Sequence, residues 1–299
     1  MRSLSCLLLL VLCALAPLTA LRAQDPPIEE KPIAWPKLEG PAAAKLHRVQ
    51  QALPKLPADD EQGFEALRAE IATIGAAAAP RLLKDLAKAG EKPEENEHWI
   101  ARLRALLDLT ATDAQLVPLL ARELDAASAE VRFWSAERLL AWADPRSLPA
   151  ARARYEKEKE ARVRNTLLLL RCTLGDAESL PELEKLLQKE WARWREPAHR
   201  AMQGLRSKAL SDAMLVRLQS STEETERIFA LRVLTSVGDK SAIGSISTYL
   251  DADSRALREA AVNALRAIVD HQEPRYEVSV FDLVQLVEEW KKRLPTLKR

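Results

Sequence analysis

Apolar residues recur at helical spacing through the middle of the chain, and the segment at 162–176 is the clearest case: RVRNTLLLLRCTLGD. Its main apolar positions advance by four, three and four residues, which places them on one face of an α-helix. Leu168 and Leu169 widen this face, as is typical of a helix covered by neighbours on more than one side. The pattern therefore predicts a buried helix and not a membrane segment. The residues of the face are Val163, Leu167, Leu170 and Leu174.

Gly175 and Asp176 end this segment. Glycine readily adopts the left-handed conformation that terminates a helix, and an aspartate accepts hydrogen bonds from the free amides at the start of the next helix. Gly238 and Asp239 repeat this pair, and Asp144 is followed by a proline, which suits the first position of a helix. Each unit is therefore expected to be a helix, a tight corner and a second helix. The second helices are expected at SLPELEKLL, DAMLVRL and SAIGSISTYL.

The same register recurs along the chain. An arginine precedes the corner aspartate by twelve residues in several units, and successive arginines are 31 or 32 residues apart. The unit of Arg195 has Ser207 in place of the aspartate, while an earlier unit keeps Asp113 but has Ala101 in place of the arginine. With one further unit upstream, the chain holds about seven. The marked residues are Arg132, Arg164, Arg195, Arg227 and Arg258, and Asp144, Asp176, Asp239 and Asp270.

A unit of this size cannot enclose a core by itself, so neighbouring units must stack and bury apolar residues between them. The sequence therefore predicts an all-α fold, an α-solenoid (α/α superhelix) of about seven helical hairpins over residues 43–299. A final helix is expected at 279–294 as a cap, with Ser279 and Asp282 at capping-box spacing. The alternative for this segment is an amphipathic helix that seeks a surface. Its apolar stripe comprises Val280, Leu283, Val284, Val287 and Leu294.

Four segments share one pattern: VRNTLLLLRCTLGDAESLPELEKLL, VRFWSAERLLAWADPRSLPAA, ERIFALRVLTSVGDKSAIGSISTYL and LREAAVNALRAIVD. This pattern resembles HEAT-like repeats of the short kind that are also found in phycobilisome lyases, and the resemblance covers residues 60–270. It implies the solenoid architecture and a long surface suited to binding. It also suggests an alternative role, that of an accessory or lyase-like protein.

The first residues have the pattern of a secretory signal peptide. Arg2 precedes an apolar run over 4–16, and small residues follow up to Ala23. Cleavage after Ala23 makes 1–23 the signal peptide and yields an exported protein, periplasmic or secreted, without a membrane span; a retained anchor is the alternative. The proline-rich stretch 24–42 then predicts an extended linker, unless Trp35 docks on the first helices.

Composition and motifs exclude several function classes. The chain is 47% apolar and 30% charged with a net charge of +1, which fits neither a disordered chain nor a strongly basic nucleic-acid-binding protein. The four histidines have no metal-binding spacing, and neither a nucleophile elbow nor a phosphate-binding loop is present. We therefore predict no catalytic residues, no metal and no cofactor. Cys172, which lies among leucines, is expected to be a buried and unreactive thiol.

The repeated arginines need an explanation, because a positive side chain in the first turn of a helix faces the positive end of the helix dipole. A carboxylate can accept two hydrogen bonds from one guanidinium. We therefore predict that the arginines and aspartates marked above pair with one another as a structural ladder that keeps the units in register. An anion-binding edge formed by the same arginines is the alternative.

The segment KEWARWREPAHRAMQGLRSK, at 189–208, interleaves tryptophans with arginines. Such residues are enriched at interface hot spots and also line nucleic-acid grooves. Export argues against nucleic acid, so we predict a site for a protein or peptide. In the alternative, the two tryptophans fill the gap between consecutive units. The candidate partner-binding residues are Trp191, Arg193, Trp194 and Arg200.

These patterns together predict an exported, non-enzymatic scaffold that binds a protein or peptide partner through its solenoid surface. They point to no nucleic-acid partner. Two alternatives remain at this stage, an accessory or lyase-like protein and a purely structural component of the cell envelope.

Overall fold

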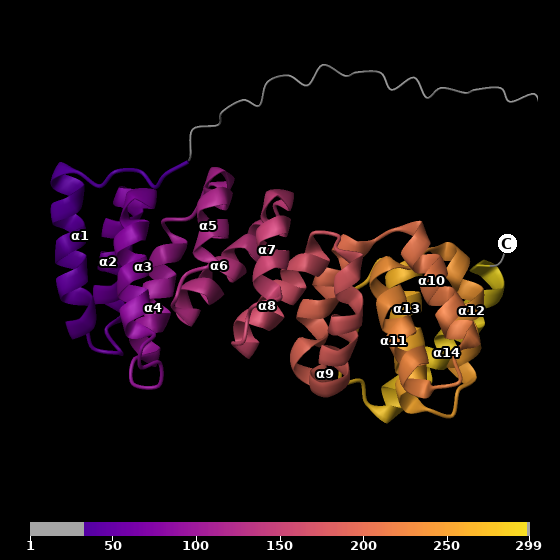
Figure 1. The fold of residues 1–299 in the computed structure, drawn as a ribbon. Helices are drawn as coiled ribbons and strands as arrows, with labels where there is room; N and C mark the ends of the chain where they lie inside the picture. Colours follow the sequence, from indigo (N-terminus) through magenta and orange to yellow (C-terminus); the bar gives the residue numbers. More distant parts are fainter. Residues whose placement is uncertain (1–32, 298–299) are drawn as a thin grey trace, which may run out of the picture. The chain divides into compact units, whose positions relative to one another are not determined.

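The structure is a computed structural model of the chain and describes residues 33–297. Within this range every regular element is helical and no strand is present, so the predicted all-α class is confirmed. The predicted signal peptide and residues 24–32 of the predicted linker lie outside the described residues. Helices α1 to α14 are joined by loops and short 3-10 turns (Figure 1). Their bounds are Gly40–Ala52 (α1), Glu61–Ile74 (α2), Ala79–Ala89 (α3), Glu97–Asp108 (α4), Val117–Glu123 (α5), Ala129–Trp142 (α6), Leu148–Tyr155 (α7), Ala161–Thr173 (α8), Leu180–Met202 (α9), Lys208–Ser220 (α10), Glu224–Val237 (α11), Ile243–Ser247 (α12), Arg255–Val269 (α13) and Val280–Leu297 (α14).

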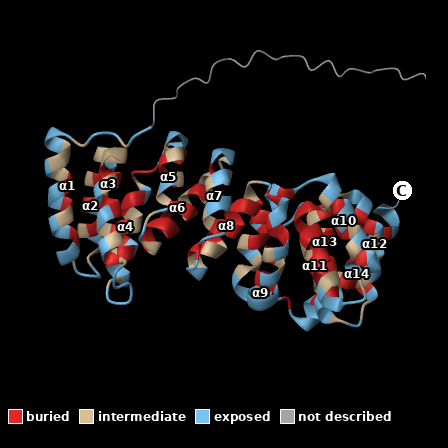
Figure 2. Cartoon of the chain, in the orientation of Figure 1, coloured by how far each residue is buried: buried red, intermediate tan, exposed pale blue. Residues whose placement is uncertain are grey.

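Each helix packs mainly against helices that are near it in the sequence. Helices α5 and α6, α7 and α8, and α10 and α11 lie side by side. The pairs also pack on one another, α6 against α8 and α11 against α13. Figure 1 shows the pairs following one another in sequence order, and Figure 2 shows buried residues along their facing sides. The apolar core therefore lies both within and between successive helix pairs.

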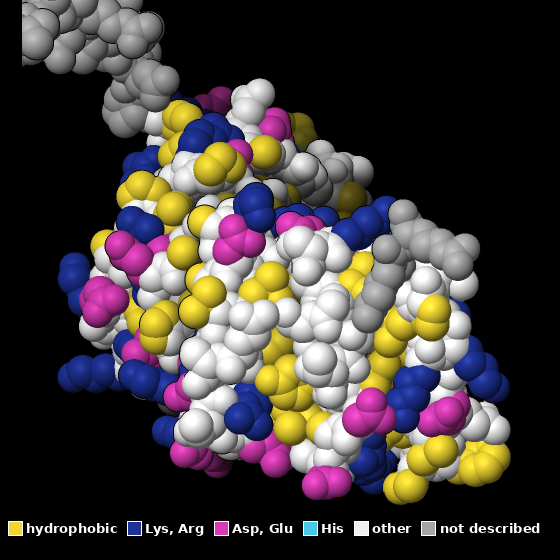
Figure 3. All heavy atoms as spheres, turned by 90° about the vertical axis from the view of Figure 1, so that its right-hand side faces the viewer, with side chains coloured by type: hydrophobic (Ala, Val, Ile, Leu, Met, Phe, Trp, Pro, Cys, Tyr) yellow, Lys and Arg dark blue, Asp and Glu magenta, His cyan; other side chains and the backbone are white. Residues whose placement is uncertain are grey.

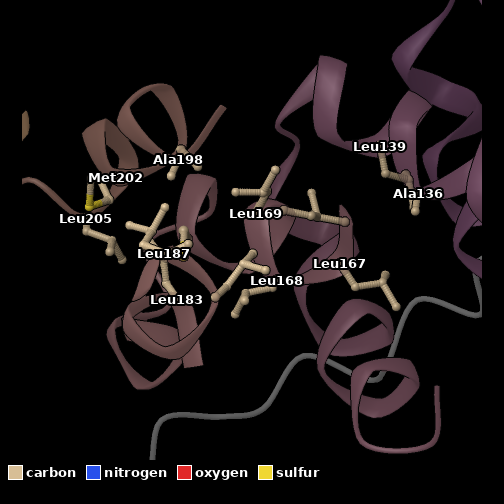
Figure 4. Close-up of a cluster of buried hydrophobic side chains, with 14 of the residues drawn as sticks. Ala136, Leu139, Leu167, Leu168, Leu169, Leu183, Leu187, Ala198, Met202 and Leu205 are labelled. Atoms are coloured by element: carbon tan, nitrogen blue, oxygen red, sulfur yellow. The ribbon is translucent and has the colours of Figure 1, made fainter. Parts of the chain in front are cut away.

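Helix α8 shows how this core is built. Its four consecutive leucines, residues 167–170, are at most 3% exposed, which confirms the predicted buried helix. In Figure 4 Leu167, Leu168 and Leu169 lie between Ala136 and Leu139 of α6 on one side and Leu183 and Leu187 of α9 on the other. Burying a leucine side chain contributes about 1.5–3 kcal/mol. The leucine run therefore stabilises the contacts of α8 with both neighbours.

The end of α8 has the predicted geometry. Gly175 has φ +82°, in the left-handed region that disfavours other residues. The Asp176 amide donates to the Arg171 carbonyl at 3.0 Å, and the Gly175 amide donates to the Cys172 carbonyl at 3.0 Å. These two bonds form a Schellman motif, which satisfies carbonyls that have no partner within the helix.

Gly238 is needed for a different reason from Gly175. Its φ of −66° and ψ of 155° are extended and open to any residue, so the predicted left-handed conformation is wrong here. A Cβ atom at this position would lie 2.5 Å from the Leu234 carbonyl oxygen and 2.7 Å from the Ile268 side chain. The carbonyl near the end of α11, together with the Ile268 side chain of α13, therefore leaves no room for a larger residue.

The corner aspartates divide into two groups. Asp144 and Asp239 each accept a hydrogen bond from the backbone amide two residues later, at 2.9 and 2.7 Å, as predicted. Asp176 does not cap the next helix. Its buried carboxylate instead accepts hydrogen bonds from Arg152 at 2.7 Å and Arg171 at 2.7 Å.

The predicted pairing of the repeated arginines with the corner aspartates is wrong. Among the residues that the structure describes, no ion pair joins the two sets; Asp270, for example, pairs with Arg293 at 2.5 Å. Four of the arginines donate to a backbone carbonyl that precedes their own helix. These bonds are Arg132 to Ala126 (2.9 Å), Arg164 to Tyr155 (2.8 Å), Arg227 to Ser221 (2.8 Å) and Arg258 to Ala252 (2.7 Å).

Helix geometry explains this outcome. Twelve residues of α-helix span about 18 Å, so the arginines lie at one edge of the stacked helices and the aspartates at the other. Backbone carbonyls at the end of the preceding helix lack a helical partner and carry the negative end of its dipole. The arginine therefore joins the end of one helix pair to the start of the next. Arg195 departs from this pattern and pairs with Glu277 at 2.6 Å.

The helical region begins at Gly40, three residues before the predicted boundary at 43. Upstream of it, Trp35 packs against the core and its side chain hydrogen-bonds to Glu123 of α5. This part of the proline-rich stretch therefore lies on the helices, as in the docking alternative.

The final helix begins at Val280 and extends three residues beyond its predicted end. The Asp282 amide donates to the Ser279 hydroxyl at 3.0 Å, and that hydroxyl donates to the Asp282 carboxylate at 2.8 Å, so the predicted capping residues do cap the helix. Part of the predicted apolar stripe faces outward, because Val280 and Val284 are 60% and 54% exposed. The buried residues of the stripe are Leu283, Val287 and Leu294, and Trp290, which the predicted stripe did not include, is buried with them.

The surface at the α14 end mixes apolar, basic and acidic side chains (Figure 3). Basic and acidic groups are interspersed there, in keeping with the net charge of +1. In the span from residue 33 to 297, none of the helices combines the length and the apolar character that crossing a bilayer requires.

Candidate functional site

A cavity of about 250 Å³ lies between the second half of α9, helices α11 and α13, and the loop 270–279 that follows α13. Helix α9 is broken at Glu190, whose φ of −134° and ψ of 44° are not helical, so its second half starts afresh at Trp191. This break lets the second half pack along α11. The side chains that line the cavity are Trp191, Arg195, His199, Met202, Arg232, Thr235, Ala256, Glu259, Ala260, Asn263, Pro274 and Tyr276.

The loop 270–279 forms one wall of the cavity and is fixed by side chains of the helices beneath it. Asn263 of α13 donates to the Arg275 carbonyl at 3.0 Å and accepts from the Arg275 amide at 2.8 Å. Arg255 donates to the Val278 carbonyl at 2.6 Å. Arg195, as noted above, pairs with Glu277 on the same loop. The loop is therefore attached at several points along its length.

Two aromatic rings supply the apolar part of the wall. The rings of Trp191 and Tyr276 meet edge to face, with centroids 5.9 Å apart at 80°. Burial raises the pKa of Tyr276 to about 12, so its hydroxyl is neutral at physiological pH. The two rings come from positions far apart in the sequence and meet because the loop folds back over α9.

Arg232 of α11 faces these rings. Its guanidinium lies 3.4 Å from the centroid of the Trp191 ring. Burial lowers the pKa of Arg232 to about 10, and the charge of Glu259 opposes this shift without a direct ion pair. The side chain remains protonated at physiological pH, and no hydrogen bond or ion pair joins it to another described residue. It therefore places a positive charge with free N–H donors at the cavity.

His199 lies between Ser236 and Glu273. Its Nδ1 is 2.8 Å from the Ser236 hydroxyl oxygen and its Nε2 is 3.2 Å from the Glu273 carboxylate. Burial lowers the pKa of His199, so the ring is largely neutral at pH 7 although Glu273 opposes this shift. This order of groups is that of a catalytic triad, but Ser236 is only 1% exposed and a substrate carbonyl has no access to it. The three residues form a network that holds the loop.

Of the predicted partner-binding residues, the structure places Trp191 in the cavity wall and the others outside it. Trp191 lines the cavity, whereas Arg200 lies beside it on an adjoining hollow of about 350 Å³. Trp194 lies outside the cavity, and its indole N–H donates to Glu190 at 3.2 Å. Arg193 is exposed and pairs with Glu190 at 3.5 Å. Both tryptophans are also half-buried against the core, as the packing alternative predicts.

Several residues of the cavity were not singled out by the sequence analysis, chiefly Arg232, Asn263 and Tyr276. Tyr276 lies in the segment HQEPRYEV, which carries no apolar periodicity, and no sequence pattern marks it as lying over α9. No sequence pattern marks Arg232 either, because it lies between apolar residues of α11 and outside the repeated arginine positions.

The described residues form no candidate metal site, and their one cysteine is unreactive. Between residues 33 and 297, no three His, Cys, Asp or Glu side chains come together in a way that could hold a metal ion. Cys172 is buried, as predicted, and burial raises the pKa of its thiol to about 11. Its sulfur lies 3.0 Å from the Ser179 hydroxyl. A thiol in this state is a poor nucleophile.

Comparison of the chain with models of known protein families finds no match, and neither does comparison with curated proteins.

Proposed function

We propose that this chain is an exported, non-enzymatic α-solenoid of HEAT-like repeats that binds another protein or a peptide. The repeat architecture is supported by the sequence-order packing of the helix pairs and by the arginines that contact preceding carbonyls at regular intervals. Stacked repeats of this kind present extended binding surfaces.

The observation that carries the binding proposal is the cavity beside Trp191. Protein interiors are close-packed, so a cavity of this size lined by a half-buried arginine that stacks on Trp191 and has no anionic partner among the described residues is better explained by binding than by packing. Tryptophan, tyrosine and arginine are also the residues most enriched at interface hot spots. We infer that a side chain or chain end of the partner enters the cavity, while the exposed residues Arg193 and Arg200 contact the rest of the partner.

Affinity capture with chemical crosslinking tests this proposal on the mature protein in its native cell envelope. The Trp191→Ala variant is compared with wild type and with Val216→Ala, whose side chain is 64% exposed on α10 and lies outside the cavity. We expect a specific partner with wild type and Val216→Ala that is lost with Trp191→Ala. Circular dichroism checks that each variant remains helical. Equal capture by all three proteins contradicts the proposal.

Export is tested separately by sequencing the N-terminus of the mature protein. A chain that begins at Gln24 supports removal of a signal peptide after Ala23. A protein that begins at Met1 and stays in the cytoplasm contradicts export.

A further inference from the structure

The charges around the cavity leave one basic group available. Among the described residues of the cavity wall, Arg195 is paired with Glu277 and His199 is largely neutral beside Glu273. Arg232 has no anion in direct contact, since Glu259 acts on it only at longer range. A guanidinium has five N–H donors in a planar fork that matches the two oxygens of a carboxylate. The cavity is therefore suited to an anion of this shape.

Apart from Arg232, the cavity wall is suited to an apolar or flat group. Trp191 and Tyr276 present ring surfaces, and Met202, Ala260 and Pro274 add aliphatic area. The volume of about 250 Å³ lies just below the roughly 300–1,000 Å³ of common ligand pockets. It fits one side chain or a small acid better than a drug-sized molecule.

Of the other polar groups of the wall, Glu259 is acidic and the Tyr276 hydroxyl is neutral, so neither supplies a positive charge, and two more are already hydrogen-bonded. The Asn263 amide is taken up by the Arg275 backbone, and the Thr235 hydroxyl donates to the Leu231 carbonyl at 2.9 Å. Recognition of a ligand therefore depends on Arg232. We propose that the cavity binds a carboxylate attached to an apolar or aromatic group, with the carboxylate on Arg232 and the apolar part against Trp191 and Tyr276.

Two sources offer this chemistry, the C-terminal residue of a peptide and a free small carboxylic acid. The peptide form rests on the proposed function, because it makes the cavity the recognition point for the partner. The small-acid form does not depend on that function.

Isothermal titration calorimetry on the wild-type protein separates the sources and tests the chemistry. The probes are N-acetyl-phenylalanine and the tripeptide Ala-Ala-Phe, each as the free acid and as the C-terminal amide. We expect both acids, or the peptide acid alone, to bind, and each amide to bind about tenfold more weakly or worse, because it loses the charge-assisted hydrogen bonds. Binding of the small acid as tightly as the peptide acid assigns the cavity to free acids, whereas binding of the peptide acid alone assigns it to chain ends.

Variants place the effect at Arg232. Arg232→Met keeps an unbranched apolar stem but removes the guanidinium, and it is expected to abolish the preference for acid over amide. Arg232→Lys keeps the charge without the planar fork, so the preference should persist but weaken. Arg81→Met, on the exposed side of α3 and away from the cavity, serves as the control and should bind like wild type.

The acid and amide comparison is decisive even if an Arg232 variant fails to fold. Equal binding of acid and amide overturns the proposal, and so does the absence of binding by every probe. If partner capture still depends on Trp191 in that case, the proposed function survives and only the carboxylate site is wrong. If N-acetyl-phenylalanine binds as tightly as the peptide acid but no partner is captured, the cavity is a small-acid site and the proposed function is wrong.

Discussion

Arg132 donates two hydrogen bonds to Glu158, at 2.8 and 3.0 Å, and the Glu158 carboxylate is almost completely buried. Arg154 adds a third bond at 2.9 Å, and the backbone amide of Glu160 adds a fourth at 2.9 Å. Burial raises the pKa of Glu158, but these bonds outweigh it and lower the pKa to about 2. The pair joins the first turn of α6 to the loop before α8.

This pair predicts how acid affects stability. A carboxyl group whose pKa is lower in the folded state stabilises the fold above its unfolded pKa of 4.5, and the contribution disappears as the pH falls toward 2. The shift corresponds to about 3 kcal/mol at pH 7. We expect Glu158→Gln to lower the free energy of unfolding by about that amount at pH 7, because two arginines remain without an anion.

Urea denaturation of wild type and Glu158→Gln at several pH values measures this effect. The difference between the two proteins should be constant from pH 7 to pH 5 and should narrow as the pH falls below 4.5. A difference that is the same at pH 7 and pH 3 is the result that contradicts this account.

The bond from Arg258 to the Ala252 carbonyl tests the repeated contact between helix pairs. Removing the arginine leaves carbonyls at the end of the preceding helix without a donor, so Arg258→Met should cost about 1–3 kcal/mol. Arg193→Met removes an arginine that is exposed and should change the free energy of unfolding by about 0.5 kcal/mol or less. Equal effects of the two substitutions, measured by urea denaturation, would mean that the carbonyl contact contributes nothing.

The sequence predicted where the repeated arginines lie, but not what they bind. Apolar spacing and the corner residues depend on local backbone geometry, so the helix of the leucine run and the end of α8 could be derived from nearby residues alone. Every residue has a backbone carbonyl, so residue types and their spacing cannot show which carbonyl accepts the hydrogen bond. The aspartates were visible in the sequence, and for that reason the prediction assigned the arginines to the wrong acceptors.

Gly238 and Gly244 should respond to alanine in opposite directions. At Gly238 the added methyl group would lie 2.5 Å from the Leu234 carbonyl oxygen, so Gly238→Ala should destabilise the protein by about 1–3 kcal/mol. At Gly244, in α12, nothing lies within 4 Å of the added atom, and alanine favours the helix by about 0.5–1 kcal/mol. Thermal unfolding of the two variants checks this prediction. The unfolding midpoint should fall below that of wild type in Gly238→Ala and rise above it in Gly244→Ala.

The cavity illustrates a second limit of prediction from sequence. Trp191 was identified because tryptophans and arginines cluster around it, and this cue is local. Tyr276 reaches Trp191 only because the loop after α13 folds back across α9, and no periodicity encodes that path. The break in α9 at Glu190 was equally hidden, since the surrounding residues favour helix. The predicted cluster was therefore incomplete.

The loop 270–279 should loosen when Asn263 is removed. Asn263→Ala deletes the two hydrogen bonds to the Arg275 backbone, so the amides of residues 275–278 should exchange with solvent faster, while the amides of α6 and α8 should keep their protection. Gln219→Ala, which removes an exposed hydrogen bond to Ser245, is the matched control and should leave this loop unchanged.

Hydrogen exchange measured by mass spectrometry resolves these segments. If exchange accelerates throughout the protein in Asn263→Ala, the asparagine supports the whole core and not the loop in particular. If the loop exchanges at the wild-type rate, then Arg255, Arg195 and His199 are sufficient to hold it. Acceleration confined to the loop means that Asn263 maintains the wall against which Tyr276 meets Trp191, and the same variant should then bind the acid probes more weakly although its Arg232 is intact.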